Sequence, residues 1–301
     1  MVNAQDKLVM RAAIDRLGLP NPEWSAVHSV EDLVAFGDRI GWPVVLKTPR
    51  GGYDGKGVRI VDSADDALET ADWFQAMNPP LLAEAKVDFS RELSALVARS
   101  PSGESRAWPV VHTIQVDGVC DEVIAPAQNI SVEVAAAAEE AALRIANELG
   151  VTGVMAAELF ETPGIGAGFL INELAMRPHN TGHWTQDGSI TSQFEQHLRA
   201  VLDLPLGATD ALAPPVVVMK NFLGGDNQDL FKAFPMALAF EPAAKVHSYG
   251  KSVRPGRKIG HVNLVGSSVS DVDSVRQRAT TVANIIRDGR KPEQTTLEET
   301  A

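Results

Sequence analysis

The chain is poor in cysteine, since Cys120 is the single one among 301 residues. One cysteine excludes an internal disulfide framework and suits a reducing compartment, so we expect a cytoplasmic protein. Asp121 and Glu122 follow it directly. Because their negative charges disfavour a thiolate, Cys120 is expected to be structural and not nucleophilic.

Long apolar runs and an excess of positive charge are missing too. No apolar run has the length of a membrane span and no secretory leader is recognisable, so no membrane partner is expected. A net charge of -12 without a large basic cluster argues against nucleic-acid binding. With 45% hydrophobic and 22% charged residues, the chain has the composition of a globular protein with room for two or three compact units.

Short strand-like and helix-like segments alternate irregularly, and turn sequences typical of antiparallel pairs separate them. This pattern predicts an α+β fold and not a doubly wound sheet. Helices are expected at 6–17, 65–74, 132–149, 191–203 and 271–287. Strands are expected at 44–46, 58–61, 81–87, 92–98, 108–115, 154–160, 168–174 and, as short strands, from 216 to 264. The Pro-rich link 213–215 is expected to set a small separate β unit apart from the main body, which ends near 207.

The segment 171–184 concentrates reactive side chains behind a short apolar run. Asn172 and Glu173 offer hard oxygen ligands of the kind that Mg²⁺ prefers. Arg177 and His179 lie two residues apart, so on an extended segment they point the same way, toward an anionic substrate. By itself the segment fits a solvated polar loop equally well.

A glycine-rich turn, residues 51–57, lies between two expected strands and is flanked by Lys47 and Lys56. Glycines leave backbone amides open to a phosphate chain, and two ammonium groups add positive charge. A dinucleotide-binding fingerprint would open a helix instead. A plain hairpin turn is the alternative, and the two lysines favour phosphate binding over it.

Two glutamates, Glu158 and Glu173, lie on consecutive strands of an expected hairpin, where they can face each other. Like charges side by side are unfavourable unless a cation lies between them, and Mg²⁺ accepts one or two carboxylates together with phosphate oxygens. A glycosidase acid and base pair is the alternative. Two lysines beside a glycine-rich turn have no use in that chemistry.

Two further segments offer nucleotide or phosphate contacts. The strand 81–87 can pair its backbone with adenine, with Glu84 or Glu92 taking the ribose hydroxyls, although a surface strand with ordinary charges fits the same residues. The basic turn 251–258 is able to grip one phosphate group.

The order of these parts resembles the ATP-grasp enzymes over residues 1 to about 200. Within that superfamily the chain is similar to the 5-(carboxyamino)imidazole ribonucleotide synthases. The motifs that carry the resemblance are 52–57, 153–155, 172–175, 177–180, 182–185 and 254–261.

The resemblance implies an ATP-grasp fold, in which two α+β subdomains clasp ATP, with a small C-terminal β unit. The implied division is an ATP-grasp domain over 1–207 with a lid subdomain at about 27–90, a β domain over 213–268, and a helix with a tail over 269–301. The implied reaction is a ligase step of purine (IMP) biosynthesis. ATP, bicarbonate and 5-aminoimidazole ribonucleotide react through carboxyphosphate, with ATP and Mg²⁺ as cofactors, in a cytoplasmic homodimer.

The resemblance also assigns roles to residues. Arg177 and His179 are implied to be the catalytic residues that contact bicarbonate. Glu158 and Glu173 are implied to bind Mg²⁺. ATP is implied to contact Lys47, Gly52, Tyr53, Asp54, Gly55, Lys56, Gly57, Glu84, Ala85, Lys86, Val87, Glu92, Gln115, Asn172 and Glu173. The substrate phosphate is implied to contact Arg254, Arg257 and Lys258.

Two features depart from that family. Its members normally begin with a further domain of about a hundred residues, whereas this chain starts where the central domain is expected. Ala85 and Lys86 fill positions where acidic or apolar residues are common. Two alternatives stay open: a nucleotide-binding module without full turnover, and another ATP-grasp ligase such as a biotin-type carboxylase, which the motif 254–261 disfavours.

Overall fold

The computed structural model describes residues 2–51, 57–76, 80–212 and 216–290. Its named strands form two sheets, and every pair of neighbouring named strands is antiparallel. Helices and strands occur in irregular order along the chain. The α+β class expected from the sequence is therefore confirmed.

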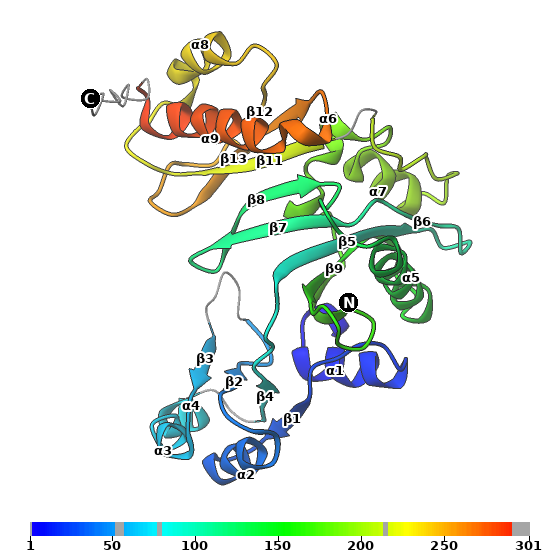
Figure 1. Cartoon of the computed structure of the whole chain (residues 1–301), viewed down its shortest axis with the longest axis vertical. Helices are drawn as coiled ribbons and strands as arrows, with labels where there is room; N and C mark the ends of the chain where they lie inside the picture. Colours follow the sequence, from blue (N-terminus) through cyan, green and yellow to red (C-terminus); the bar gives the residue numbers. More distant parts are fainter. Residues whose placement is uncertain (1, 52–56, 77–79, 213–215, 291–301) are drawn as a thin grey trace.

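The smaller sheet has the strand order β1-β4-β2-β3. Leu33 and Phe36 of one helix pack on Val44 and Leu46 of this sheet in a core of their own. The sheet and its helices form the lower part of Figure 1. The bounds are β1 Trp24–Val27, α2 Val30–Ile40, β2 Val44–Lys47, β3 Val58–Val61, α3 Ala64–Leu68, α4 Ala71–Ala76 and β4 Leu81–Ala85.

The larger sheet has the order β10-β9-β5-β7-β8-β11-β13-β12, and β6 pairs with β5. The C-terminal strands enter it through β11, which pairs with β8, so they extend this sheet and form none of their own. The bounds are β5 Arg91–Arg99, β6 Ser105–Ala107, β7 Val111–Val116, β8 Val119–Ala125, β9 Gly153–Glu161, β10 Phe169–Ala175, β11 Val216–Leu223, β12 Lys245–Ser248 and β13 Lys258–Gly266.

Helices pack on the larger sheet, and α5 has a recognisable cap at each end. The Ser131 side chain accepts a hydrogen bond from the Val134 N–H and starts α5, and Gly150 follows the helix with a positive φ of 60°. No helix of the described residues is long and apolar enough to cross a membrane. The helices are η1 Val2–Ala4, α1 Lys7–Arg16, α5 Val132–Glu148, η2 Asn180–Gly182, α6 Thr185–Gly188, α7 Gln193–Val201, α8 Leu230–Phe240, η3 Val269–Asp271 and α9 Val272–Asp288.

Several expected elements differ from the observed ones. The segment expected as short strands from 216 to 264 contains helix α8, whose almost wholly apolar sequence carries no strand alternation. The expected helix 65–74 is two short helices, α3 and α4. The strand expected at 108–115 begins only at Val111, because Pro109 lacks the N–H that a ladder needs. Helix α2 was not expected.

Candidate active site

Two carboxylates lie opposite each other at the centre of the candidate site. Glu158 of β9 and Glu173 of β10 are register partners, as expected from the sequence. The register shifts between Ile171 and Glu173, so Asn172 is the extra residue that brings Glu173 level with Glu158. Burial and the nearby charge of Glu173 raise the pKa of Glu158 to about 7. Such a pair is stabilised by a cation between the two groups.

A chain of hydrogen bonds positions His179 against this pair. Its Nε2 lies 3.1 Å from Glu158 Oε1, and its Nδ1 lies 2.9 Å from Thr181 Oγ1. Thr181 is bonded in turn to Ser94 on β5 at 2.8 Å. Burial and the charge of Arg177 lower the pKa of His179 to about 3, so the ring is neutral at pH 7. A neutral imidazole has one donor and one acceptor nitrogen, and with Nδ1 held by Thr181 a bound anion would take the place of Glu158 at Nε2.

The backbone of His179 is fixed separately by Gln193, the fully buried first residue of α7. Its Oε1 accepts from the His179 N–H and its Nε2 donates to the His179 carbonyl, both at 2.8 Å. No role of Gln193, Thr181 or Ser94 was expected from the sequence. Gln193 follows Ser192, the helix cap, and this position in the sequence does not indicate that the Gln193 side chain binds the backbone of His179.

Glu84 on β4 is a buried ion-pair centre. Its Oε2 lies 2.6 Å from Lys47 Nζ and its Oε1 lies 2.5 Å from Arg11 Nε. Although burial raises the pKa of Glu84, the charges of Lys47 and Arg11 lower it below its ordinary value. Both carboxylate oxygens are engaged within the protein, which favours Glu92 over Glu84 as the predicted contact to the ribose hydroxyls.

Glu92 is the better-placed of the two acidic candidates. It lies on β5 two residues before Ser94, which is the register partner of Glu158, so Glu92 is on the same face of the sheet as the glutamate pair. Burial raises the pKa of Glu92, and a hydrogen bond from Gln115 partly offsets this. After Glu84, Ala85 ends β4, and Lys86 and Val87 continue outside any strand, with Lys86 exposed.

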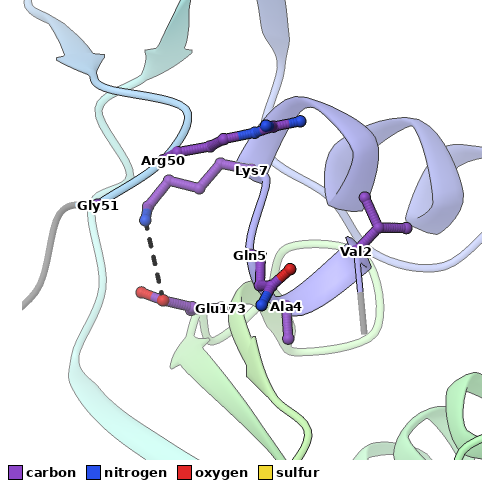
Figure 2. A pocket seen from close by; sticks show the side chains of 7 residues that line it. All are labelled: Val2, Ala4, Gln5, Lys7, Arg50, Gly51 and Glu173. Atoms are coloured by element: carbon purple, nitrogen blue, oxygen red, sulfur yellow. Dashed lines mark ion pairs between the residues drawn. The ribbon is translucent and has the colours of Figure 1, made fainter.

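A cavity of about 390 Å³ opens beside Glu173. Figure 2 shows Lys7 and Arg50 above this carboxylate, with Lys7 Nζ 3.8 Å from Glu173 Oε1. Gly51 also lines the cavity. The next five residues of the expected phosphate loop, 52–56, lie outside the described residues, while Gly57 accepts a bond from the Thr48 N–H and closes the base of the loop. The sequence analysis missed Lys7 and Arg50.

Arg177 lies two residues after the end of β10 and is exposed. Its Nη1 donates to the Pro178 carbonyl at 3.0 Å, and its charge contributes to the lowered pKa of His179. The charge of Lys258, the first residue of β13, contributes to the same shift. The two cations therefore act on the same imidazole, although they come from segments eighty residues apart in the sequence.

The basic turn before β13 is anchored by Gly224. A Cβ at Gly224 would lie 2.1 Å from the Arg254 carbonyl oxygen, so only glycine permits this approach. The Gly224 N–H donates to the Arg257 carbonyl at 2.8 Å. Arg254 and Arg257 are exposed and Lys258 is half-buried, so the turn presents two guanidinium groups outward beside the site.

Three stacked imidazoles lie beside the site. The ring of His261 is stacked on His183 at 4.8 Å and on His247 at 4.6 Å between centroids. Tyr249 Oη lies 2.8 Å from His261 Nδ1, and Asp187 Oδ2 lies 2.7 Å from His247 Nε2. Burial and the neighbouring histidines lower the pKa of His261 to about 2. The ring is therefore neutral in the folded protein at ordinary pH.

The lowered pKa of His261 predicts how the stability of the protein depends on pH. His261 gains a proton in the unfolded chain below its ordinary pKa of 6.5 but not in the folded protein, so the free energy of unfolding falls as pH drops from 6.5 toward 2. In the His261→Phe variant, the free energy of unfolding should change less steeply with pH, by about 1.4 kcal/mol per pH unit between pH 5.5 and 4. Urea unfolding measures it, with the exposed His28→Phe as the control. Equal slopes in parent and His261→Phe contradict the assignment.

The donor set fits Mg²⁺. Among the described residues no cluster of three or more His, Cys, Asp or Glu side chains is arranged to hold a metal ion. Two glutamates at one register position match the one or two carboxylates that Mg²⁺ takes from a protein when phosphates supply further oxygens. Glu158 and Glu173, with Asn172 beside them, are thus the residues that would hold the ion.

Comparisons with known proteins match the chain to two domain families. The chain matches the ATP-grasp domain over residues 12–194 and the phosphoribosylaminoimidazole carboxylase C-terminal domain over 217–275. It is 50% identical over 293 residues to the N5-carboxyaminoimidazole ribonucleotide synthase of Mycobacterium tuberculosis, covering 96% of this chain and 67% of that protein. The ATP-grasp fold implied by the resemblance is confirmed.

Two crystal structures of such synthases are similar as well. The one from Thermus thermophilus has a TM-score of 0.80 at 36% identity, covering 93% of this chain and 72% of that one. The one from Aspergillus clavatus, in complex with ADP and 5-aminoimidazole ribonucleotide, has a TM-score of 0.80 at 30% identity, covering 94% and 74%.

Proposed function

The chain belongs to the N5-carboxyaminoimidazole ribonucleotide synthase family, and we propose that it uses ATP and bicarbonate to carboxylate the amine of 5-aminoimidazole ribonucleotide. The products are the N5-carboxylated ribonucleotide, ADP and phosphate. The observation that carries this proposal is the register pair Glu158 and Glu173 beside a cavity with two cations, Lys7 and Arg50. Anionic substrates and a divalent ion both match that set of charges.

Different residues around the cavity are proposed to bind different parts of ATP. Lys47 and the turn 51–57 are proposed to hold the phosphates, and Lys7 and Arg50 add positive charge beside Glu173. The segment 84–87 is proposed to meet adenine through its backbone, with Glu92 and Gln115 near the ribose. Bound Mg²⁺ would supply charge neutralisation between the phosphates.

Arg177 and His179 are proposed to hold bicarbonate. A planar guanidinium matches a planar oxyanion, and the neutral imidazole, fixed by Thr181 and Gln193, adds a directed hydrogen bond. An oxygen of bicarbonate attacks the γ-phosphorus of ATP and displaces ADP. This step forms carboxyphosphate. Carbon dioxide released from it is taken up by the amine, which loses a proton, and phosphate is the second leaving group.

The opposite end of the site is proposed to bind the 5′-phosphate of the ribonucleotide. Arg254 and Arg257 face outward on the turn anchored at Gly224. The charge of Lys258 acts on His179. A separate phosphate site of this kind is what distinguishes a ribonucleotide substrate from the small substrates of other ATP-grasp ligases. It supports the synthase over the biotin-type alternative.

A cytoplasmic homodimer belongs to the same proposal. The single thiol, Cys120, is buried, and burial raises its pKa to about 12, which agrees with a structural role in a reducing compartment. Helix α7 leaves large apolar side chains exposed, namely Phe194, Leu198, Val201 and the adjoining Leu202. Such a patch supports self-association. A sedimentation mass equal to the 32.2 kDa of one chain at micromolar concentration would contradict it.

Substrate-dependent release of ADP tests the proposed activity. We expect the chain, with ATP, Mg²⁺ and bicarbonate, to release ADP at least tenfold faster when 5-aminoimidazole ribonucleotide is added, because the amine consumes the activated carboxylate. A coupled assay for ADP measures the rate, and the ribonucleoside without its phosphate is the control. ADP release that the ribonucleotide leaves unchanged identifies a nucleotide-binding module and contradicts the synthase.

A further inference from the structure

Arg11 is a fully buried cation in the middle of α1. Its Nε donates to Glu84 Oε1 at 2.5 Å, its Nη1 to the Ile171 carbonyl at 2.5 Å, and its Nη2 to the Asn172 carbonyl at 3.0 Å. Nη1 also lies 2.9 Å from Asn21 Oδ1. A buried guanidinium is costly to desolvate, and this one is stable because every arm of its fork has an acceptor.

The acceptors of Arg11 belong to the two different sheets. Glu84 lies on β4 of the smaller sheet, at the start of the segment proposed to meet adenine. Ile171 and Asn172 lie at the register shift of β10, directly before Glu173. In the part of the chain that the structure describes, the two sheets share no strand pairing, and α1 lies between them in Figure 1. A single side chain therefore connects the proposed adenine strand with the proposed metal strand.

The charges around Glu84 also indicate that Arg11 has a supporting role. Arg11 and Lys47 both contact this one carboxylate, so the three groups together carry one net positive charge. Since Arg11 already compensates Glu84, the ammonium of Lys47 is not cancelled and remains attractive to a phosphate. Arg11 itself is fully buried, so we expect it to act on the ligand through its partners.

We propose that Arg11 is a positioning residue, which holds the adenine end of β4 and the register shift of β10 in one fixed relation. Nucleotide contacts at β4 then place the phosphates where the metal pair can reach them. The proposal rests on the proposed function for the roles of β4 and Glu173. Its specific consequence is that Arg11 couples nucleotide binding to Mg²⁺ binding.

The affinity of the full chain for ADP, measured by calorimetry with excess Mg²⁺ and again in EDTA, tests the coupling. In Arg11→Lys the ammonium can still neutralise Glu84 but cannot also reach both carbonyls of β10. We expect its affinity in EDTA to stay within twofold of the parent, and the enhancement by Mg²⁺ to fall about tenfold. The matched control is Arg39→Lys, which alters an exposed pair with Glu23 and should change neither affinity.

Other outcomes contradict the proposal. Equal losses with and without Mg²⁺ would show Arg11 to be merely structural, and no loss would show that the link is not needed. If circular dichroism shows Arg11→Lys to be unfolded, Arg11→Gln replaces it, and failure of both to fold also makes Arg11 a structural residue. Failure of the proposed function is distinct, because it would show in the parent chain itself, either as no binding of ADP or as ADP release that the ribonucleotide leaves unchanged.

Discussion

Exchange of Glu173 for glutamine is expected to lower the rate of ADP release about a thousandfold. A metal ion between phosphates contributes several kcal/mol of charge stabilisation in the transition state, and roughly 4 kcal/mol corresponds to this factor. Glutamine keeps the size of the side chain and removes its charge. Because Glu158 is the register partner, it would be left as the single carboxylate of the pair, so the metal ion would lose one of its two charged protein ligands.

The Glu173→Gln experiment separates metal binding from folding by titrating Mg²⁺ at saturating ATP. The Mg²⁺ concentration needed for half of the residual rate should rise, while the thermal unfolding temperature should stay near that of the parent, since Glu173 is partly exposed. Glu140→Gln, on the exposed face of α5, is the matched control and should behave as the parent. A variant with the parental rate and Mg²⁺ requirement would exclude Glu173 as a ligand.

Exchange of Arg177 for methionine is expected to raise the KM for bicarbonate at least tenfold and to lower kcat about a hundredfold. A hydrogen bond to a charged group contributes about 1.5–3 kcal/mol, and a guanidinium fork can make two of them to one oxyanion. Arg177 is exposed and bonded to the adjacent Pro178 carbonyl, so its loss should leave the fold intact. Methionine retains much of the length of the side chain without its charge.

The two effects of Arg177→Met are measured by varying bicarbonate in the ADP-release assay, with ADP binding as the reference. ADP affinity should not change, because Arg177 is not among the proposed nucleotide contacts. Arg199→Met removes an exposed arginine paired with Glu195 and should change neither constant. An unchanged KM for bicarbonate in Arg177→Met means that another group holds this substrate.

The glutamate pair could be predicted from the sequence because strand alternation and a glycine-rich connection define the hairpin that carries it. Glu158 and Glu173 are the register partners that this pattern predicts. The extra residue, Asn172, could not be predicted, since a one-residue register shift leaves no periodic signal in a strand of seven residues. The roles proposed for the individual site residues remain predictions.

Arg11 and the helices α2 and α8 show why the rest was missed. Arg11 occurs among polar residues of an amphipathic helix, where an arginine is ordinarily solvated. Its burial depends on partners 73 and 160 residues away, which no local pattern reveals. Helix α2 did have a signal, because Ser29 caps it and its Oγ accepts from the Asp32 N–H. Helix α8 has no such signal, since its sequence is apolar apart from Lys232 and contains Pro235.

The pairing of β11 with β8 bears on how the chain can be divided. The three-part division at 207 and 268 remains a proposal, and the larger sheet crosses its first boundary. A fragment ending at residue 207 would lose β11, leaving β8 with a free row of N–H and C=O groups along the segment that now pairs, Glu122 to Ala125. Unprotected edges of this kind recruit strands from other molecules, so the isolated N-terminal part would be prone to aggregation. By covering this edge of β8, the C-terminal strands thus protect the N-terminal part of the chain from aggregation.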